Sequence, residues 1–110
     1  MPDYAYFFSY KPETWAQLLA APGDRTPAVR ATVEDAGGEL RSLHYTLDTF
    51  GGLAIVDAPD ADTAATIGLV ITASGAFTDV RVQPLVRAGD VVPVLERARD
   101  TAAGYRRPGT

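Results

Sequence analysis

Residues 38–57, GELRSLHYTLDTFGGLAIVD, hold two runs rich in β-branched and aromatic residues, separated by turn residues. The turn is marked by Asp48-Thr49, and Gly51-Gly52 follow closely. Paired glycines permit a positive φ angle or a close approach of two backbones, as a bulged hairpin requires. We therefore predict a hairpin at the centre of a β-sheet, with the rest of the chain packed around it.

The other elements follow from hydrophobic period and capping signals. In chain order the pattern predicts a strand over Asp3–Tyr10, a short helix after Pro12, a helix begun by Thr26-Pro27, the hairpin, a helix capped by Asp60, an edge strand over Phe77–Val86, and a last helix capped by Asp90. The last helix is expected to bury a stripe made of Val91, Val94, Leu95 and Ala98.

This order of elements indicates an α+β fold, the ferredoxin-like βαββαβ arrangement with a four-stranded antiparallel sheet. Its helices cover one face and leave the other bare. The strand Asp3–Tyr10 has apolar side chains on both faces, and a bare apolar face indicates an interface or a ligand site. We therefore expect a homodimer whose sheets meet face to face as a dimeric α/β barrel. Residues 1–103 are expected to form the single domain, followed by a flexible tail over residues 104–110.

Composition argues against several classes of partner. The net charge of −4 and the lack of a basic face argue against nucleic acid and against an anionic membrane surface. The nearly apolar segment Ile67–Ala73 is far shorter than the roughly 20 residues that cross a bilayer. Without cysteine and with one histidine, a metal site is not expected, and the chain fits a reducing cytoplasm. We expect no bound cofactor.

Two segments carry a resemblance to a known family. The run from Gly37, GGELRSLHYTLDTFGGLAIVDAPD, and the run from Ile67, IGLVITASGAFTDVRVQPL, together resemble the GYD-domain family of small bacterial proteins. The resemblance implies the dimeric α/β-barrel superfamily, which includes cofactor-free monooxygenases, polyketide cyclases and isomerases with a pocket inside the barrel. The family's Gly-x-Tyr-Asp signature falls here on Asp48, Thr49, Phe50 and Gly51, so its glycine, tyrosine and aspartate are replaced.

His44 is the only histidine, in the middle of a predicted strand. Strict alternation puts it on one face with Leu40, Ser42 and Thr46, which we assign to the barrel interior. A histidine enclosed in a partly apolar cavity suits proton transfer near neutral pH. The alternative is a half-buried structural histidine that hydrogen-bonds a neighbouring strand or a second subunit.

The tyrosines are the other chemical candidates. Tyr6 and Tyr10 are expected to polarise or position a substrate through their hydroxyls, although aromatic residues in strands more often belong to the core. Further substrate contacts are predicted for Phe8, Ser42, Thr46, Asp48 and Trp15. Asp48 also suits a turn cap, and Trp15 also suits a staple that holds the first helix to the sheet.

Two functions follow as hypotheses. The first is a small cofactor-independent enzyme of the cyclase, isomerase or oxygenase type, with His44, Tyr6 and Tyr10 as catalytic residues. Its substrate would be a planar, apolar, oxygenated metabolite of bacterial secondary metabolism. The second is a non-catalytic dimeric module that binds a metabolite or a protein. Convergence of His44 and the tyrosine hydroxyls on one cavity would favour the enzyme.

Overall fold

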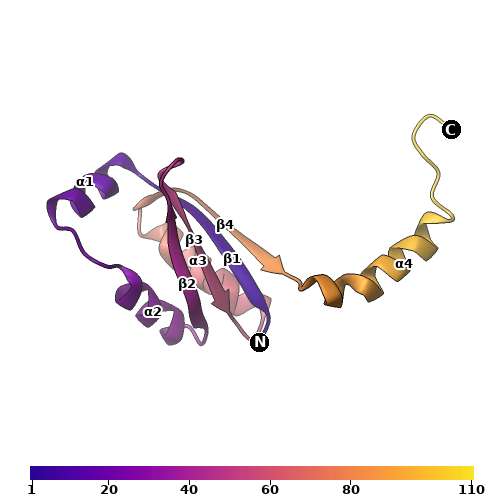
Figure 1. Ribbon diagram of the computed structural model, residues 1–110, viewed down its shortest axis with the longest axis horizontal. Helices are drawn as coiled ribbons and strands as arrows, with labels where there is room; N and C mark the ends of the chain where they lie inside the picture. Colours follow the sequence, from indigo (N-terminus) through magenta and orange to yellow (C-terminus); the bar gives the residue numbers. More distant parts are fainter.

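The computed structural model describes residues 1–110 and centres on strand β1 (Asp3–Tyr10). On one side β1 pairs with β3 (Gly51–Asp57), and on the other with β4 (Phe77–Leu85). Strand β2 (Glu39–Thr46) pairs with β3, which gives the order β2-β3-β1-β4 with every pair antiparallel. The α+β, ferredoxin-like prediction is confirmed, and β4 is an edge strand as expected. The hairpin supplies one central strand and one edge strand (Figure 1).

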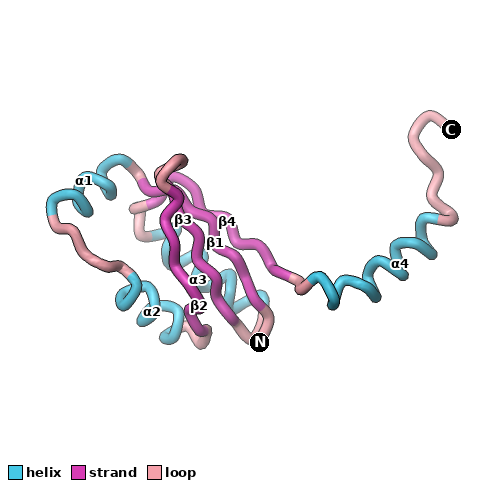
Figure 2. Tube along the Cα trace, in the orientation of Figure 1, coloured by secondary structure: helices cyan, strands magenta, loops and turns pink.

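The helices occupy the connections that this topology requires (Figure 2). Helices α1 (Pro12–Ala20) and α2 (Thr26–Asp35) join β1 to β2, and α3 (Ala61–Ala73) joins β3 to β4. Helix α2 lies against β2 and α3 lies against β4. A short 3-10 turn, η1 (Ala88–Val91), leads from β4 into α4 (Val92–Ala102).

Local sequence signals explain where two of these helices begin. Asp60 caps α3, because its side chain accepts a hydrogen bond from the Thr63 amide at 2.8 Å. Thr26, which the sequence predicts as the N-cap of α2, is instead its first helical residue, and the N-cap position is held by Arg25, whose side chain makes no cap hydrogen bond. The Asp24 carboxylate accepts from the Thr26 amide at 2.9 Å.

The core lies between the sheet and the helices, and we call this side of the sheet the helix face. Val33 of α2 and Ile67 of α3 pack there against Tyr6 of β1. The remaining buried members are Tyr4, Leu40, Ala54, Val56, Ala58 and Ala64. The opposite side, the open face, carries no helix of this chain.

Strand β2 does not alternate regularly. Its register with β3 shifts between Leu40 and Ser42, so Arg41 is the extra residue of a β-bulge. Leu40 therefore lies opposite Val56 on the helix face, whereas His44 lies opposite Leu53 on the open face. The prediction that Leu40 shares a face with His44 is wrong, because strict alternation fails at a bulge.

The bulge residue makes the principal ion pair of the fold. The Arg41 guanidinium binds the Oδ2 atom of Asp57, the last residue of β3, and Asp57 is buried, with 3% of its surface exposed. The hydrogen bond from Arg41 holds the pKa of Asp57 below its ordinary value. A buried carboxylate without a cation is costly, so the pair favours the bulged register.

Helix α4 contradicts its prediction. It extends away from the sheet beyond β4 (Figure 1) and has no buried residue. Val94 and Leu95 are each 58% exposed, although they belong to the stripe that we expected to be buried. Asp90 also does not cap α4, because it lies within η1 and Val91 precedes the helix. The stripe is apolar, but no surface of this chain covers it.

Gly51-Gly52 act through close approach and not through a positive φ angle. Neither glycine has a positive φ, whereas Phe50 before them does, at 54°. The Phe8 ring lies directly over Gly52, and a Cβ atom built at position 52 would lie 2.1 Å from Phe8 Cζ. Only glycine leaves room for this ring on the helix face.

Substitution of Gly52 therefore tests the packing of the Phe8 ring. We expect Gly52→Ala to displace the ring and to lower the free energy of unfolding by about 1–3 kcal/mol, the usual cost of overpacking. Gly89→Ala is the control, because nothing lies within 4 Å of its added Cβ atom and its φ is not positive. Chemical denaturation of both variants measures the difference. Equal stabilities would contradict the close packing of Phe8 on Gly52.

Candidate functional site

A cavity of about 450 Å³ lies between the helix face of the sheet and helices α1, α2 and α3. Most of its lining is apolar, with Val29 and Val33 from α2, Ile67 and Ile71 from α3, and Leu43 from β2. This size and lining are typical of small-molecule sites. The pocket belongs to one chain and lies on the opposite side of the sheet from the open face.

One end of the pocket is aromatic. The Phe8 and Phe77 rings meet edge to face with centroids 5.5 Å apart, and Tyr10 lies 5.1 Å from Phe77 and 5.2 Å from Trp15. Tyr45 completes the group, 5.7 Å from Trp15. We call these five residues the aromatic wall. Phe8, Tyr10 and Phe77 line the pocket, and Trp15 and Tyr45 pack against Tyr10. Such a wall suits a flat apolar ligand, because rings stack or meet edge to face at these separations.

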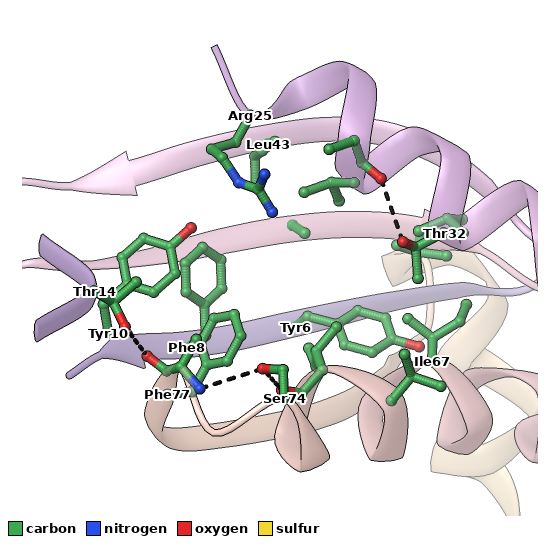
Figure 3. A pocket seen from close by; sticks show the side chains of 18 of the residues that line it. Tyr6, Phe8, Tyr10, Thr14, Arg25, Thr32, Leu43, Ile67, Ser74 and Phe77 are labelled. Carbon is green, nitrogen blue, oxygen red and sulfur yellow. Dashed lines mark hydrogen bonds between the residues drawn. The ribbon is translucent and has the colours of Figure 1, made fainter. Parts of the chain in front are cut away.

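Most hydroxyls of the pocket already have partners (Figure 3). Four of them donate to main-chain carbonyls: Thr14 to Ala76 at 2.7 Å, Ser74 to Ile71 at 2.5 Å, Tyr6 to Ala64 at 2.6 Å, and Thr32 to Ala28 at 3.3 Å. Tyr10 differs, since its hydroxyl oxygen makes no bond to the main chain and lies 3.3 Å from the hydroxyl oxygen of Tyr45. The Tyr10–Tyr45 pair is therefore the polar feature of the aromatic wall.

The tyrosines of the pocket are donors and not bases. Burial raises the pKa of Tyr6 to about 12. Burial also raises the pKa of Tyr10, and the hydrogen bond with Tyr45 raises it further, against a smaller opposing effect of Arg25. Both phenols therefore stay protonated at neutral pH.

Arg25 is a pocket residue that the sequence analysis missed. It precedes α2, and its guanidinium points into the pocket toward Tyr10 (Figure 3). Its side chain forms no ion pair, and it lies close enough to the Tyr10 hydroxyl to oppose the rise in the pKa of Tyr10. An arginine in a loop carries no sequence signal that distinguishes a pocket residue from an ordinary surface charge.

The structure does not bring the proposed catalytic residues together. Tyr6, Phe8 and Tyr10 line the pocket on the helix face. His44, by contrast, is exposed on the open face, where Ser42 and Thr46 also lie. A sheet separates the imidazole from the tyrosine hydroxyls.

The two remaining predicted contacts lie near the β2–β3 turn. Asp48 is exposed in the turn and makes no side-chain hydrogen bond. Trp15 donates its indole N–H to the Phe50 carbonyl at 3.0 Å and meets the Tyr10 ring edge to face. Trp15 thus holds α1 to the sheet, but it is not among the residues that line the pocket.

No three His, Cys, Asp or Glu side chains of the chain lie close enough together to hold a metal ion. None of the helices combines the length and the apolar character that crossing a bilayer requires.

The four-stranded antiparallel sheet with helices on one face defines an α+β protein of the ferredoxin-like type, with its pocket under the helices. Within that class, residues 4–93 match the family model of the GYD domain, and the chain belongs to the GYD-domain family. No curated protein matches the chain with significant similarity. The comparisons therefore name no ligand or reaction for the pocket.

The hydrogen bond of Tyr6 can be tested apart from any contact with a ligand. Tyr6→Phe removes a buried bond to α3, and we expect the free energy of unfolding to fall by about 0.5–1.5 kcal/mol. Tyr4→Phe is the matched control, because Tyr4 is buried on the same strand but its hydroxyl makes no hydrogen bond. Thermal denaturation measures both. Equal effects of the two substitutions would contradict a stabilising role for the Tyr6 hydroxyl.

Proposed function

We propose that this chain is a homodimeric binding protein whose pocket takes a planar, apolar, oxygenated small molecule in the cytoplasm. The observation that carries the proposal is the aromatic wall at the end of an apolar cavity of about 450 Å³. A flat ring system buries its faces against such a wall, while an oxygen atom of the ligand accepts a hydrogen bond from the Tyr10–Tyr45 pair.

A binding role is favoured over acid–base catalysis by what lines the pocket. The lining contains no carboxylate, imidazole, thiol or amine side chain. A general base for neutral pH needs a pKa near that pH, and the raised pKa values of the pocket tyrosines exclude them from this role. The pocket of one chain can therefore bind and orient a ligand, but its side chains offer no base.

A cofactor-independent enzyme of the cyclase, isomerase or oxygenase type is the second candidate, because of His44. The imidazole is exposed on the open face beside Ser42 and Thr46. If a second copy covers this face, His44 becomes enclosed between two sheets, an environment in which histidine suits proton transfer. The reaction site would then be the barrel interior and not the pocket.

The homodimer is supported by two apolar surfaces that this chain leaves uncovered. On the open face, Phe7, Leu53 and Ile55 are only half-buried. On α4, Val94 and Leu95 are exposed, and a helix of 11 residues is marginal in water without a surface to pack on.

The charge distribution favours a second copy of the chain as the partner that packs against α4. Residues 92–110 contain four arginines and two acidic residues, whereas residues 1–91 contain twelve acidic and six basic residues. The arm formed by α4 and the tail is thus basic, and the body of the molecule is acidic. Because α4 points away from its own sheet, the acidic body of a second copy is the complementary surface.

Light scattering and native mass spectrometry at micromolar concentration test this assembly. We expect a dimer for the full chain, and weaker dimerisation when residues 92–110 are deleted, because the apolar stripe of α4 is lost. Deletion of residues 104–110 alone is the control and should change neither the dimer nor the melting temperature. A well-folded monomer of the full chain would contradict the homodimer. An unchanged dimer without residues 92–110 would confine the interface to the open face.

His44→Gln separates the two candidate functions. Glutamine keeps hydrogen-bonding capacity at a similar length but cannot exchange a proton near neutral pH. Since His44 is exposed and far from the pocket, we expect the free energy of unfolding to change by less than about 0.5 kcal/mol. Binding of the planar probe 2-naphthol, measured by calorimetry, should also remain unchanged. Loss of probe binding at unchanged stability would place the ligand on the open face and favour the enzyme.

A further inference from the structure

The pocket is unbalanced in charge. Arg25 is the only charged side chain in its lining, which holds no carboxylate. The hydroxyls of Tyr6, Thr14 and Ser74 already donate to main-chain carbonyls. A negatively charged group that enters the pocket can therefore pair with Arg25, whereas a cation finds no counter-charge there.

Arg25 supplies the positive charge of the pocket. No acidic side chain pairs with it, and the nearest acid in sequence, Asp24, is engaged elsewhere. Asp24 accepts a hydrogen bond from the Thr26 amide at 2.9 Å, and that bond lowers the pKa of Asp24. The Arg25 guanidinium is left with its full charge at the entrance of an apolar cavity.

The Tyr10–Tyr45 pair is the second donor. In a pair of hydroxyls that bond to each other, one proton lies between the oxygens and the other is free. Tyr10 lines the pocket, and the Arg25 guanidinium points toward it (Figure 3). A ligand oxygen placed beside Arg25 is therefore also near the Tyr10 hydroxyl.

We propose that the ligand of this pocket is a planar apolar carboxylate, bound through Arg25 and the Tyr10–Tyr45 pair, with its ring system against the aromatic wall. This inference rests on the proposed binding function and adds the chemical class of the ligand. A carboxylate brings acceptor oxygens and the negative charge that an unpaired guanidinium favours. The planar fork of arginine matches a carboxylate with two parallel hydrogen bonds.

Calorimetric titration with two probes tests the inference. 2-Naphthoate and 2-naphthamide have the same ring system, but only the first is an anion. We expect the wild-type protein to bind the carboxylate at least about tenfold more tightly, the factor typical of one charge-assisted hydrogen bond. Raising the salt concentration should reduce this preference, because Arg25 is exposed to solvent.

Arg25→Gln should abolish the preference and leave 2-naphthamide binding unchanged, which also shows that the variant is folded. Arg30→Gln is the matched control, because it removes the same charge from α2 at a position that does not line the pocket. Tyr45→Phe should weaken 2-naphthoate binding by a smaller factor, because the lone Tyr10 hydroxyl can still donate.

Each other outcome has a defined meaning. Equal binding of the two probes by the wild type overturns the carboxylate class and leaves the proposed function standing. A preference that survives Arg25→Gln overturns the role of Arg25. If neither probe binds, both this inference and the proposed binding function are overturned.

Discussion

The ion pair between Arg41 and Asp57 supports the bulge that sets which side chains of β2 face the helices. It favours the bulge in β2, and a bulge exchanges the two faces for every residue that follows it. Without the extra residue, Leu43 and Tyr45 would point to the open face, and His44 would point toward the helices. The pocket would then lose the partner of the Tyr10 hydroxyl and gain an imidazole. The chemistry of the pocket thus depends on one ion pair at the far end of the strand.

The bulge also separates the pocket from the open face. The aromatic wall and Arg25 lie on the helix face, beside α1, α2 and α3. The open face carries His44 with half-buried apolar residues, and no helix of this chain covers it. In the proposed dimer, a ligand in the pocket would therefore not touch the contact between sheets. A catalytic His44 would instead require the dimer, because only a second copy can enclose it.

Much of the fold could be predicted from sequence, because its signals are local. The Asp60 cap, the glycines that end helices and the alternation of Asp3–Tyr10 each act within a few residues. The candidate site could be predicted only in part, since Tyr10, Phe8 and Trp15 were found but were grouped with His44. Nothing near Arg41 marks a bulge, because its cause is the carboxylate of Asp57 on another strand. The sequence also does not predict that Arg25 lines the pocket or that the apolar stripe of α4 is exposed, because both depend on tertiary contacts.

The altered family signature replaces side chains but leaves a backbone contact intact. Positions 48–51, where the signature falls, form the β2–β3 turn and the first residue of β3. The turn is tied to α1 through the carbonyl of Phe50, which accepts from Trp15, and a carbonyl is present whatever side chain stands there. The contact that positions Trp15 beside Tyr10 therefore survives replacement of the signature tyrosine. Replacement of the signature aspartate puts Gly51 at the start of β3, and it leaves the aromatic wall in place. For this reason the fold of the family persists in a chain whose pocket chemistry must be sought at Arg25 and the Tyr10–Tyr45 pair.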